Sequence, residues 1–307
     1  MNILLTAVGK RVQLIKHLKK TSNVFGTDIS MLAPAACFVD GFYIVPKCSE
    51  KNYVNELIKI CKKESIDMLI PLYEREFELL CEYREEFEKV NTILLLSNKN
   101  VIKVCNDKWE TYKFFNENEI KTPKSFSIKE KPYDVRFPLI IKPRDGMGSS
   151  SVFKIYDNND LNFFASKVHN PIIQQYVEGT EYTIDVLCDL NSKIISIVPR
   201  QRIEVRAGEV TKSKTVKDKK IIDKTFELCT KLKGIGPLTI QCIKDKFDNI
   251  YFIEINPRFG GGVPLTFESG ADYGKFFNFM KAGKKIEYEI GDFKELTMLR
   301  YDEAVYR

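Results

Sequence analysis

Histidine is scarce in this sequence, and closely spaced cysteines are absent. Only His17 and His169 occur among 307 residues. Neither has a metal-ligand neighbour at helical spacing, so we do not expect a histidine-based metal site. The eight cysteines include no Cys-x-x-Cys pair, and several fall at apolar positions of periodic segments. This pattern favours reduced core residues and leaves a zinc or redox role as the alternative.

Apolar runs long enough to cross a bilayer and long basic blocks are also missing. A membrane-spanning helix needs about 20 mostly apolar residues, and Met1 leads directly into a strand-like segment instead of a basic and then apolar leader. We therefore expect a cytoplasmic protein that contacts no membrane. The net charge is +6, but lysine and arginine are interspersed with aspartate and glutamate. This mixture favours a small anionic ligand over nucleic acid, which stays the alternative.

The composition is that of a globular protein with room for two domains. Hydrophobic residues make up 44% and charged residues 29% of the sequence, a balance that disordered and fibrous proteins do not have. Strand-like and helix-like patterns alternate in the first hundred residues, which predicts a parallel sheet covered by helices. We expect strands at residues 3–7, 24–28, 42–45, 68–70 and 92–96, and helices at 12–18, 54–61 and 77–87.

The pattern changes after a predicted helix at residues 107–116. A hairpin with a glycine-serine tip, a helix and a strand are expected between residues 137 and 177, and mostly strands follow, as in an antiparallel sheet. We expect these later strands at residues 181–190, 193–198, 238–244 and 250–255, and helices at 219–233 and 267–282. The chain is therefore predicted to form three units, at residues 1–106, 107–179 and 180–307.

The segment from Glu254 to Arg258 carries the strongest chemical signal. It follows the apolar strand 250–253, and side chains two residues apart in a strand point to the same face. Mg²⁺ prefers hard oxygen ligands and shares them with substrate phosphates. We predict that Glu254 and Asn256 hold such an ion and that Gln241, on the neighbouring strand, adds a third oxygen. Arg258 would then meet the terminal phosphate; the alternative is a strand that ends in a surface turn.

Lys142 and the loop that follows it form a second candidate site. Lys142 ends an apolar strand, where an ammonium group is costly unless an anion meets it. Small residues fill the loop, at Gly146, Gly148, Ser149 and Ser150. Backbone N–H groups in such a loop can approach phosphate oxygens without obstruction by side chains. Taken alone, the loop is equally consistent with a flexible turn.

Three further segments are weaker candidates. In the charged stretch 200–212, we expect Arg200 or Arg202 to touch a substrate carboxylate, with a solvated loop as the alternative. The glycines 260–262 either let a substrate approach the backbone closely or form a simple loop. Residues 9–11 lie between a strand and a helix, where α/β sheets bind ligands, and are either structural or part of a second-substrate cleft.

In their order along the chain, these residues resemble a known enzyme family. The ordered set consists of Lys108, Lys142, Gly146 to Ser150, Gln174 to Tyr182, Gln241, and Glu254 to Arg258. This order and spacing is similar to the ATP-grasp superfamily, and within it to the branch that includes the large chain of carbamoyl-phosphate synthase. Residues 4–11 also resemble the start of that branch's N-terminal domain, so the resemblance spans the whole chain.

The resemblance implies how the chain would hold nucleotide phosphates and metal. Lys108 and Lys142 match the two lysines that bind ATP phosphates, and residues 146–150 match the lid loop that closes over them. The metal ligands of the family match Gln241, Glu254 and Asn256. Many members carry a carboxylate at the first of these positions, so the glutamine here is a departure from the family pattern.

The resemblance also implies an adenosine site. Gln174 stands where a glutamate often contacts adenine in the family. Gln175, Tyr176 and Val177 correspond to the hinge segment beside the base, and Glu181 corresponds to the carboxylate that binds the ribose hydroxyls.

For the whole chain, the resemblance implies an α/β and α+β protein with the ATP-grasp fold. We expect a Rossmann-like N-terminal domain with a parallel sheet, a small lid subdomain, and a C-terminal antiparallel-sheet subdomain that carries the metal site. The implied enzyme uses ATP with Mg²⁺ (or Mn²⁺) to convert a carboxylate to an acyl phosphate, which an amine, ammonia or a thiol captures. The expected partners are small-molecule carboxylate and amine substrates, with a homodimer possible.

Two alternatives to the ligase remain open at this point. One is a phosphorylating enzyme similar to carbamoyl-phosphate synthase, although that reaction normally needs two ATP-grasp halves. The other is a regulatory module that binds ATP without turnover.

Overall fold

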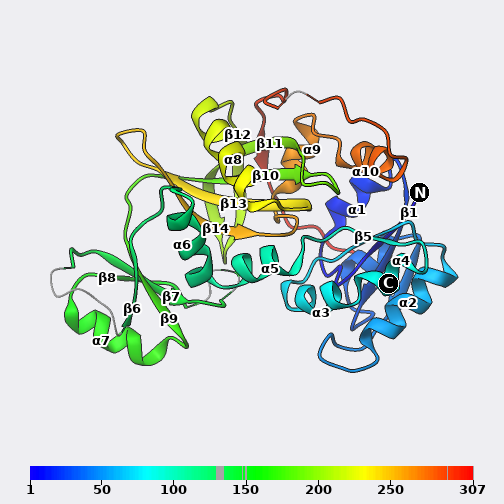
Figure 1. The fold of residues 1–307 in the computed structure, drawn as a ribbon, viewed down its shortest axis with the longest axis horizontal. Coiled ribbons are helices and arrows are strands. Elements are labelled where there is room, and N and C mark those ends of the chain that lie inside the picture. The colour runs from blue at the N-terminus through cyan, green and yellow to red at the C-terminus, as the bar shows by residue number, and fades with distance from the viewer. Residues whose placement is uncertain (129–134, 147, 149–150, 289, 307) are drawn as a thin grey trace.

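The structure is a computed structural model that describes residues 1–128, 135–146, 148, 151–288 and 290–306. Its strands form three sheets, of five, six and four strands. The five-stranded sheet lies at one end of the molecule, the four-stranded sheet at the other, and the six-stranded sheet between them (Figure 1). This mixed α/β architecture confirms the predicted fold class.

The N-terminal sheet is parallel, as predicted, with the strand order β3-β2-β1-β4-β5. Ile3, Leu4 and Leu5 of its central strand are fully buried, because helices cover both faces of a parallel sheet. The elements are β1 (Asn2–Leu5), α1 (Val12–Leu18), β2 (Asn23–Asp28), η1 (Pro34–Cys37), β3 (Gly41–Ile44), α2 (Tyr53–Lys63), β4 (Met68–Ile70), η2 (Glu74–Glu76), α3 (Phe77–Glu82), α4 (Arg84–Glu88) and β5 (Ile93–Leu94).

Two helices connect this sheet to the rest of the chain, α5 (Lys99–Asn106) and α6 (Lys108–Glu117). Asn98 and Asp107 cap their N-termini, each by accepting a hydrogen bond from a backbone N–H group. Trp109 lies in the first turn of α6. The sequence predicted α6 but not α5, although the buried residues of α5, Val101, Ile102 and Cys105, have helical spacing.

The lid subdomain is a four-stranded antiparallel sheet with one helix. Its strand order is β6-β9-β7-β8. It has a small hydrophobic core of its own, which includes Leu139, Ile141, Leu161 and Ile173. The elements are β6 (Ser125–Ser127), β7 (Leu139–Pro143), β8 (Phe153–Ile155), α7 (Asn158–Lys167) and β9 (Pro171–Gln175).

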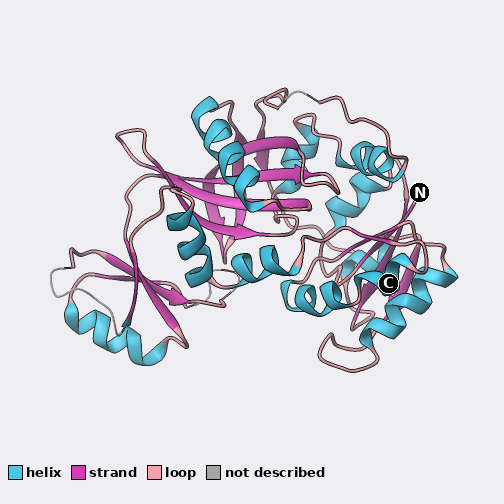
Figure 2. Ribbon diagram, in the orientation of Figure 1, coloured by secondary structure: helices cyan, strands magenta, loops and turns pink. Residues whose placement is uncertain are grey.

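The largest sheet is antiparallel and has the strand order β14-β13-β10-β11-β12-β15. Hairpins join β10 to β11 and β13 to β14, as predicted. Its long strands cross the middle of the molecule (Figure 2). The elements are β10 (Thr180–Cys188), β11 (Ile194–Arg206), β12 (Glu209–Thr215), α8 (Lys219–Leu232), β13 (Gly236–Lys244), β14 (Ile250–Asn256), α9 (Val263–Glu268), α10 (Tyr273–Lys281) and β15 (Thr297–Leu299).

Residues 200–212 form most of a β-hairpin, so the alternative of a solvated loop is wrong. Ala207 and Gly208 make the two-residue turn between β11 and β12, with φ of +49° and +77°. Positive φ at both turn residues suits a tight hairpin. The strands were hard to recognise because charged side chains pair across them, as do Lys212 and Glu204 at 2.7 Å, so the sequence lacks the usual apolar alternation.

The helix expected at residues 267–282 is two helices. Gly270 lies between α9 and α10 with φ of +124°, which a continuous right-handed helix excludes. Among the helices of the described residues, none has the length and apolar character that crossing a membrane requires.

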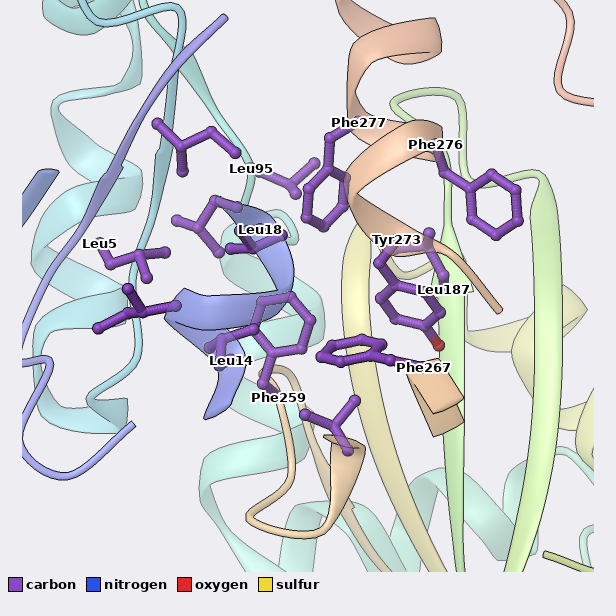
Figure 3. Packing of buried hydrophobic residues seen from close by; sticks show 14 of the residues in the cluster. Leu5, Leu14, Leu18, Leu95, Leu187, Phe259, Phe267, Tyr273, Phe276 and Phe277 are labelled. Carbon is purple, nitrogen blue, oxygen red and sulfur yellow. The ribbon is translucent and has the colours of Figure 1, made fainter. Parts of the chain in front are cut away.

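One hydrophobic core joins the N-terminal sheet to the C-terminal helices. Leu14 and Leu18 of α1 face the aromatic rings of Phe259, Phe267 and Phe277 (Figure 3). All five side chains are buried. The predicted first and third units therefore share a core, whereas the lid keeps its own.

Candidate active site

The residues predicted from the sequence surround one pocket, with a volume of about 420 Å³. The lid sheet, the start of α6 and the six-stranded sheet all contribute to its walls. The lining includes Lys108, Lys142, Gly146, Gly148, Gln174, Gln175, Tyr176, Val177, Glu181, Arg200, Arg202, Gln241, Glu254, Asn256 and Arg258. Ser149 and Ser150 lie outside the described residues.

Two lysines bring positive charge into this pocket. Lys142 is 8% exposed, and its Nζ donates to Gln174 Oε1 at 2.9 Å. Lys108 Nζ donates to the carbonyl of Gly146 at 2.7 Å and lies 3.8 Å from Glu254 Oε1. Burial lowers the pKa of Lys142 to about 8; the charge of Glu254 opposes this shift, and that of Lys108 adds to it. A desolvated cation beside a second one is suited to binding a polyanion.

Oxygen donors from β13 and β14 lie next to each other in the same pocket. Gln241 is directly opposite Glu254 in the antiparallel ladder, and Asn256 follows two residues later on β14. Within the described residues, no group of three or more His, Cys, Asp or Glu side chains is arranged to hold a metal ion. The predicted ligand set therefore has one carboxylate and two amide oxygens. Such hard donors fit Mg²⁺ when substrate phosphates supply further oxygens and negative charge.

The segment that links the lid to the large sheet is fixed by hydrogen bonds. Gln174 lies between two partners, because its Oε1 accepts from Lys142 and its Nε2 donates to Ser125 Oγ at 3.0 Å. Gln175 and Tyr176 donate their backbone N–H groups to carbonyls of neighbouring lid residues. The Gln174 amide is thus already engaged with the lysine at the position where the resemblance implied an adenine contact.

Arg200 and Arg202 both line the pocket but differ in their partners and in their exposure. Arg200 is 1% exposed and holds Asp185 with two hydrogen bonds, from Nε at 2.7 Å and Nη2 at 3.0 Å. Arg202 lies 3.2 Å from Glu181 Oε2 and donates to Thr183 Oγ1 at 3.2 Å. Burial lowers the pKa of Arg202, which the charge of Glu181 opposes. Of the two guanidinium groups, that of Arg202 is the more accessible to a ligand.

Arg258 is held by a carboxylate from the N-terminal domain. Its Nε and Nη2 lie 2.7 and 2.6 Å from Glu74 Oε1, across a sequence separation of 184 residues. Its backbone carbonyl accepts a hydrogen bond from Thr239 Oγ1 at 2.8 Å. Glu74 was not predicted as a site residue, because a partner this distant in sequence leaves no local pattern. Its place just after β4, at the carboxyl edge of a parallel sheet, was the available indication.

Gly260 and Gly262 of the run 260–262 pack closely against the protein, and Gly262 leaves no room for a side chain. A Cβ on Gly260 would lie 3.0 Å from the nearest side chain, and a Cβ on Gly262 would overlap the guanidinium of Arg200. Gly261 differs, since the atom nearest to its Cβ position is Arg11 Nη1 at 3.6 Å. The run therefore covers the buried Asp185–Arg200 pair.

A match to a family model identifies the protein family of this chain. The model described as the ATP-grasp domain matches residues 105–262, which contain every site residue that the sequence predicted. The chain belongs to the ATP-grasp family. A second model, for the N-terminal domain of PylC-like proteins, matches residues 3–95.

Two curated relatives of this ATP-grasp chain carry names that describe their reactions. The tyramine–L-glutamate ligase of Methanocaldococcus fervens is 30% identical over 214 residues, covering 68% of this chain and 64% of the ligase. A carbamoyl-phosphate synthase of Methanobrevibacter smithii is 22% identical over 246 residues, covering 74% of this chain and 65% of the synthase. The chain thus spans slightly less than two thirds of the length of either relative. The predicted resemblance to carbamoyl-phosphate synthases is confirmed.

A solved structure shares the ATP-grasp fold over nearly the whole chain. The biotin carboxylase domain of Hydrogenobacter thermophilus 2-oxoglutarate carboxylase, in complex with MgADP, ADP and bicarbonate, has a TM-score of 0.75 and 16% identity. The match covers 95% of this chain and 72% of that one. The predicted ATP-grasp fold is therefore confirmed.

Proposed function

We propose that this chain is an ATP-dependent carboxylate ligase that works through an acyl phosphate. The observation that carries the proposal is the convergence of two lysines, three oxygen donors and Arg258 on one pocket. Lysines and a divalent cation neutralise phosphate charge, and an arginine stabilises a phosphoryl group in transfer. The described pocket needs no protein nucleophile for this chemistry, because the substrate carboxylate is itself the nucleophile.

In this proposal, ATP lies between the lid and the large sheet. Lys108 and Lys142 bind its phosphates, and the loop from Gly146 to Ser150 covers them. The hinge segment Gln175 to Val177 borders adenine, and Glu181 binds the ribose hydroxyls. The hydrogen bond from Lys142 to Gln174 is a contact that the lysine exchanges for phosphate oxygens.

Gln241, Glu254 and Asn256 would hold Mg²⁺, or Mn²⁺ with the same donors. When bound, the cation offsets the negative charge of the phosphates and aligns them for transfer. Because a single carboxylate contributes charge, we propose that the ion binds together with the nucleotide and not ahead of it.

The proposed reaction has two steps. A carboxylate oxygen of the donor attacks the γ-phosphorus in line, an O–P bond forms, the bond to the β-phosphate oxygen breaks, and ADP leaves. An amine then attacks the acyl carbon, a C–N bond forms, the C–O bond to phosphate breaks, and phosphate and a proton are released. Arg258 stabilises the transferring group, with Glu74 holding its guanidinium in place. In this proposal Arg202 contacts the substrate carboxylate, while Arg200 stays paired with Asp185.

Relatives favour an amine as the acceptor. One of them is named for joining tyramine to L-glutamate, and the ammonia or thiol acceptors have no comparable support. A phosphorylating enzyme similar to carbamoyl-phosphate synthase remains the second candidate, because a synthase of that name is also a relative. The identity of the donor acid and of the amine is left to experiment.

Phosphate release from ATP and Mg²⁺ with pairs of acids and amines tests the ligase directly. Product should form only when both substrates are present. With ¹⁸O in the donor carboxylate, one label should appear in the released phosphate, because the acyl phosphate gives up that oxygen. Label that stays entirely in the organic product would contradict the acyl phosphate. A binding module would bind ATP but release no phosphate with any pair.

Glu254 supplies the first site-specific prediction. Glu254→Ala should lower kcat by at least about 100-fold, because the only carboxylate among the proposed metal ligands is removed. The matched control is Glu227→Ala, which removes an exposed carboxylate of α8 that pairs with Lys224 and should leave turnover within twofold. Unfolding curves establish that both variants fold. Near-normal turnover in folded Glu254→Ala would remove the metal assignment.

A further inference from the structure

A second cavity, of about 660 Å³, opens beside the proposed active site. Its walls come from the loop and helix that follow β1, from the residues before α9, and from the segment 300–305. The two cavities share four lining residues, Arg11, Glu209, Gly260 and Gly261. The two cavities therefore meet at these residues, and Arg11 lines both.

Arg11 is the cation without a partner at this junction. In the part of the chain that the structure describes, its side chain has no hydrogen bond or ion pair. Burial lowers the pKa of Arg11 to about 10, with the charges of Arg258 and Arg300 adding to the shift and those of Glu209 and Glu74 opposing it. A partly desolvated guanidinium whose N–H donors lack acceptors is costly in free energy, unless a ligand supplies those acceptors.

The nearby carboxylates are already engaged. Glu209 lies 3.3 Å from Lys10 and 3.3 Å from Arg300, and Glu74 is held by Arg258. Lys10, Arg300 and Arg258 thus pair with the two carboxylates where the cavities meet. Arg11 is a fourth cation there, without an ion-pair partner among the described residues. The Cβ position of Gly261 lies 3.6 Å from Arg11 Nη1 and 3.7 Å from Glu209 Cδ, so this glycine borders both side chains at the junction without adding a side chain of its own.

The lining of the second cavity carries charges of both signs. Lys16 comes from α1, and Asp302 and Glu303 come from the C-terminal segment. Two carboxylates accompany this one lysine, so an anionic group of a ligand is favoured beside Arg11 at the junction and not further into the second cavity.

We propose that the second cavity binds the acceptor substrate, and that Arg11 selects an amine that also carries a carboxylate or a phosphate. The geometry places the anionic group at the junction, so that the amine of the same molecule extends into the first cavity toward the activated acyl group. This inference rests on the ligase function proposed above. It adds the chemical class of the acceptor and a residue that discriminates among acceptors.

Binding is tested separately from turnover. The protein is saturated with Mg²⁺ and a non-hydrolysable ATP analogue, and calorimetry then measures α-amino acids, the amines left after removal of their carboxylates, and O-phosphoethanolamine. At least one anionic amine should bind about 10- to 100-fold more tightly than its matched neutral-chain amine, the range expected for a charge-assisted hydrogen bond. The amino-acid and phosphate arms decide which anion Arg11 prefers.

Arg11→Gln should remove this discrimination. Its dissociation constant for the anionic amine should rise by about 10- to 100-fold, while those for the matched amine and for the ATP analogue stay within twofold. Arg11→Lys should recover part of the loss, since it keeps the charge but not the fork of donors. The matched control is Lys20→Gln, which removes one positive charge from the residues just after α1, where Lys20 pairs with Glu268, and should change none of these values.

The two proposals fail in distinguishable ways. If no anionic amine binds, or if Arg11→Gln weakens the ATP analogue or a donor acid instead, the acceptor site is refuted. If anionic amines bind through Arg11 but no acid and amine pair yields phosphate, the ligase function is refuted and the site stands. In an active pair, the same variant should raise KM for the acceptor and leave KM for ATP unchanged.

Discussion

Lys142 is a buried amine whose hydrogen-bond partner in the protein is a neutral amide. Its Nζ contacts Gln174, and the charge of Glu254 only partly offsets its burial. The group therefore loses its proton near pH 8 instead of near 10.5. An ionised phosphate in the pocket would favour the charged form and raise this pKa again.

This shift predicts the pH dependence of ATP binding. Above pH 8, the free protein must take up a proton to charge Lys142 when ATP binds, so affinity should fall as pH rises, by up to about tenfold per pH unit. Calorimetry between pH 7 and 9.5, in buffers of different ionisation enthalpy, measures both the affinity and the proton uptake. Lys142→Arg should bind ATP with little dependence on pH, because a guanidinium stays charged over this range. If the affinity of the unaltered protein for ATP did not change with pH, the assignment of Lys142 as a phosphate-binding residue with a lowered pKa would be contradicted.

At the residue scale, local order along the chain was enough to predict most of the pocket. Glu254, Asn256 and Lys142 follow apolar strands, and a strand fixes which way alternate side chains point. Glu74 was not assigned a role, because its place depends on contact with Arg258 across the molecule. Arg11 belongs to the segment 9–11, which the sequence predicted to be either structural or part of a second-substrate cleft. The sequence places residues 9–11 at a ligand-binding edge, but it does not indicate that Arg11 has no ion-pair partner among the described residues.

At the scale of elements, the β11–β12 hairpin meets the lid. A Cβ on Gly208, at the hairpin turn, would lie 2.6 Å from the carbonyl oxygen of Gly148 in the loop after β7. Both glycines line the proposed ATP pocket. Gly208 of the hairpin turn and Gly148 of the loop after β7 therefore approach each other through backbone atoms at the wall of this pocket.

Gly208→Ala should weaken ATP binding. The added methyl group overlaps the Gly148 carbonyl, and alanine is strained at φ of +77°. A cost of about 1 kcal/mol corresponds to a roughly fivefold higher dissociation constant for ATP. Ala207→Gly in the same turn is the control and should leave binding unchanged, since glycine relieves the positive φ of residue 207. Unchanged affinity in Gly208→Ala would show that the two turns need not touch when ATP binds.

Most elements with apolar periodicity were predicted, and the charged strand β12 was not. The parallel sheet and the β13–β14 hairpin follow from apolar runs bounded by turn residues. Helix α5 was missed although Val101, Ile102 and Cys105 have helical spacing, whereas β12 has the sequence of a solvated segment, EVTKSKT. Its place in the sheet depends on pairing with β11 and β15, which is tertiary information.

At the scale of the whole molecule, the two largest sheets are joined by one core while the lid stands apart. Phe259 and Phe267 pack against α1 of the N-terminal domain (Figure 3). The lid has its own small cluster around Ile141 and Leu161. This division favours one rigid body formed by the N-terminal and C-terminal parts, with the lid sheet packed around a separate core. A homodimer stays a prediction.

The shared core predicts cooperative unfolding of the two sheets. Phe259→Ala should destabilise the protein by about 3–5 kcal/mol, because Phe259 is 1% exposed at the centre of this core. Amide hydrogen exchange in β1 and in β13 should accelerate together in this variant, and circular dichroism should give the change in midpoint. Phe247→Ala removes an exposed ring from the β13–β14 turn and should change stability by less than about 0.5 kcal/mol. Faster exchange in one sheet alone would contradict a shared core.

Trp109 is the single tryptophan of the chain. It follows Lys108 in the first turn of α6, and Lys108 lines the proposed nucleotide pocket. The tryptophan emission of the protein therefore comes from the residue next to a proposed phosphate-binding lysine. Filling the pocket should change the emission without any attached dye, so nucleotide titrations can be followed by intrinsic fluorescence against no background from other indoles.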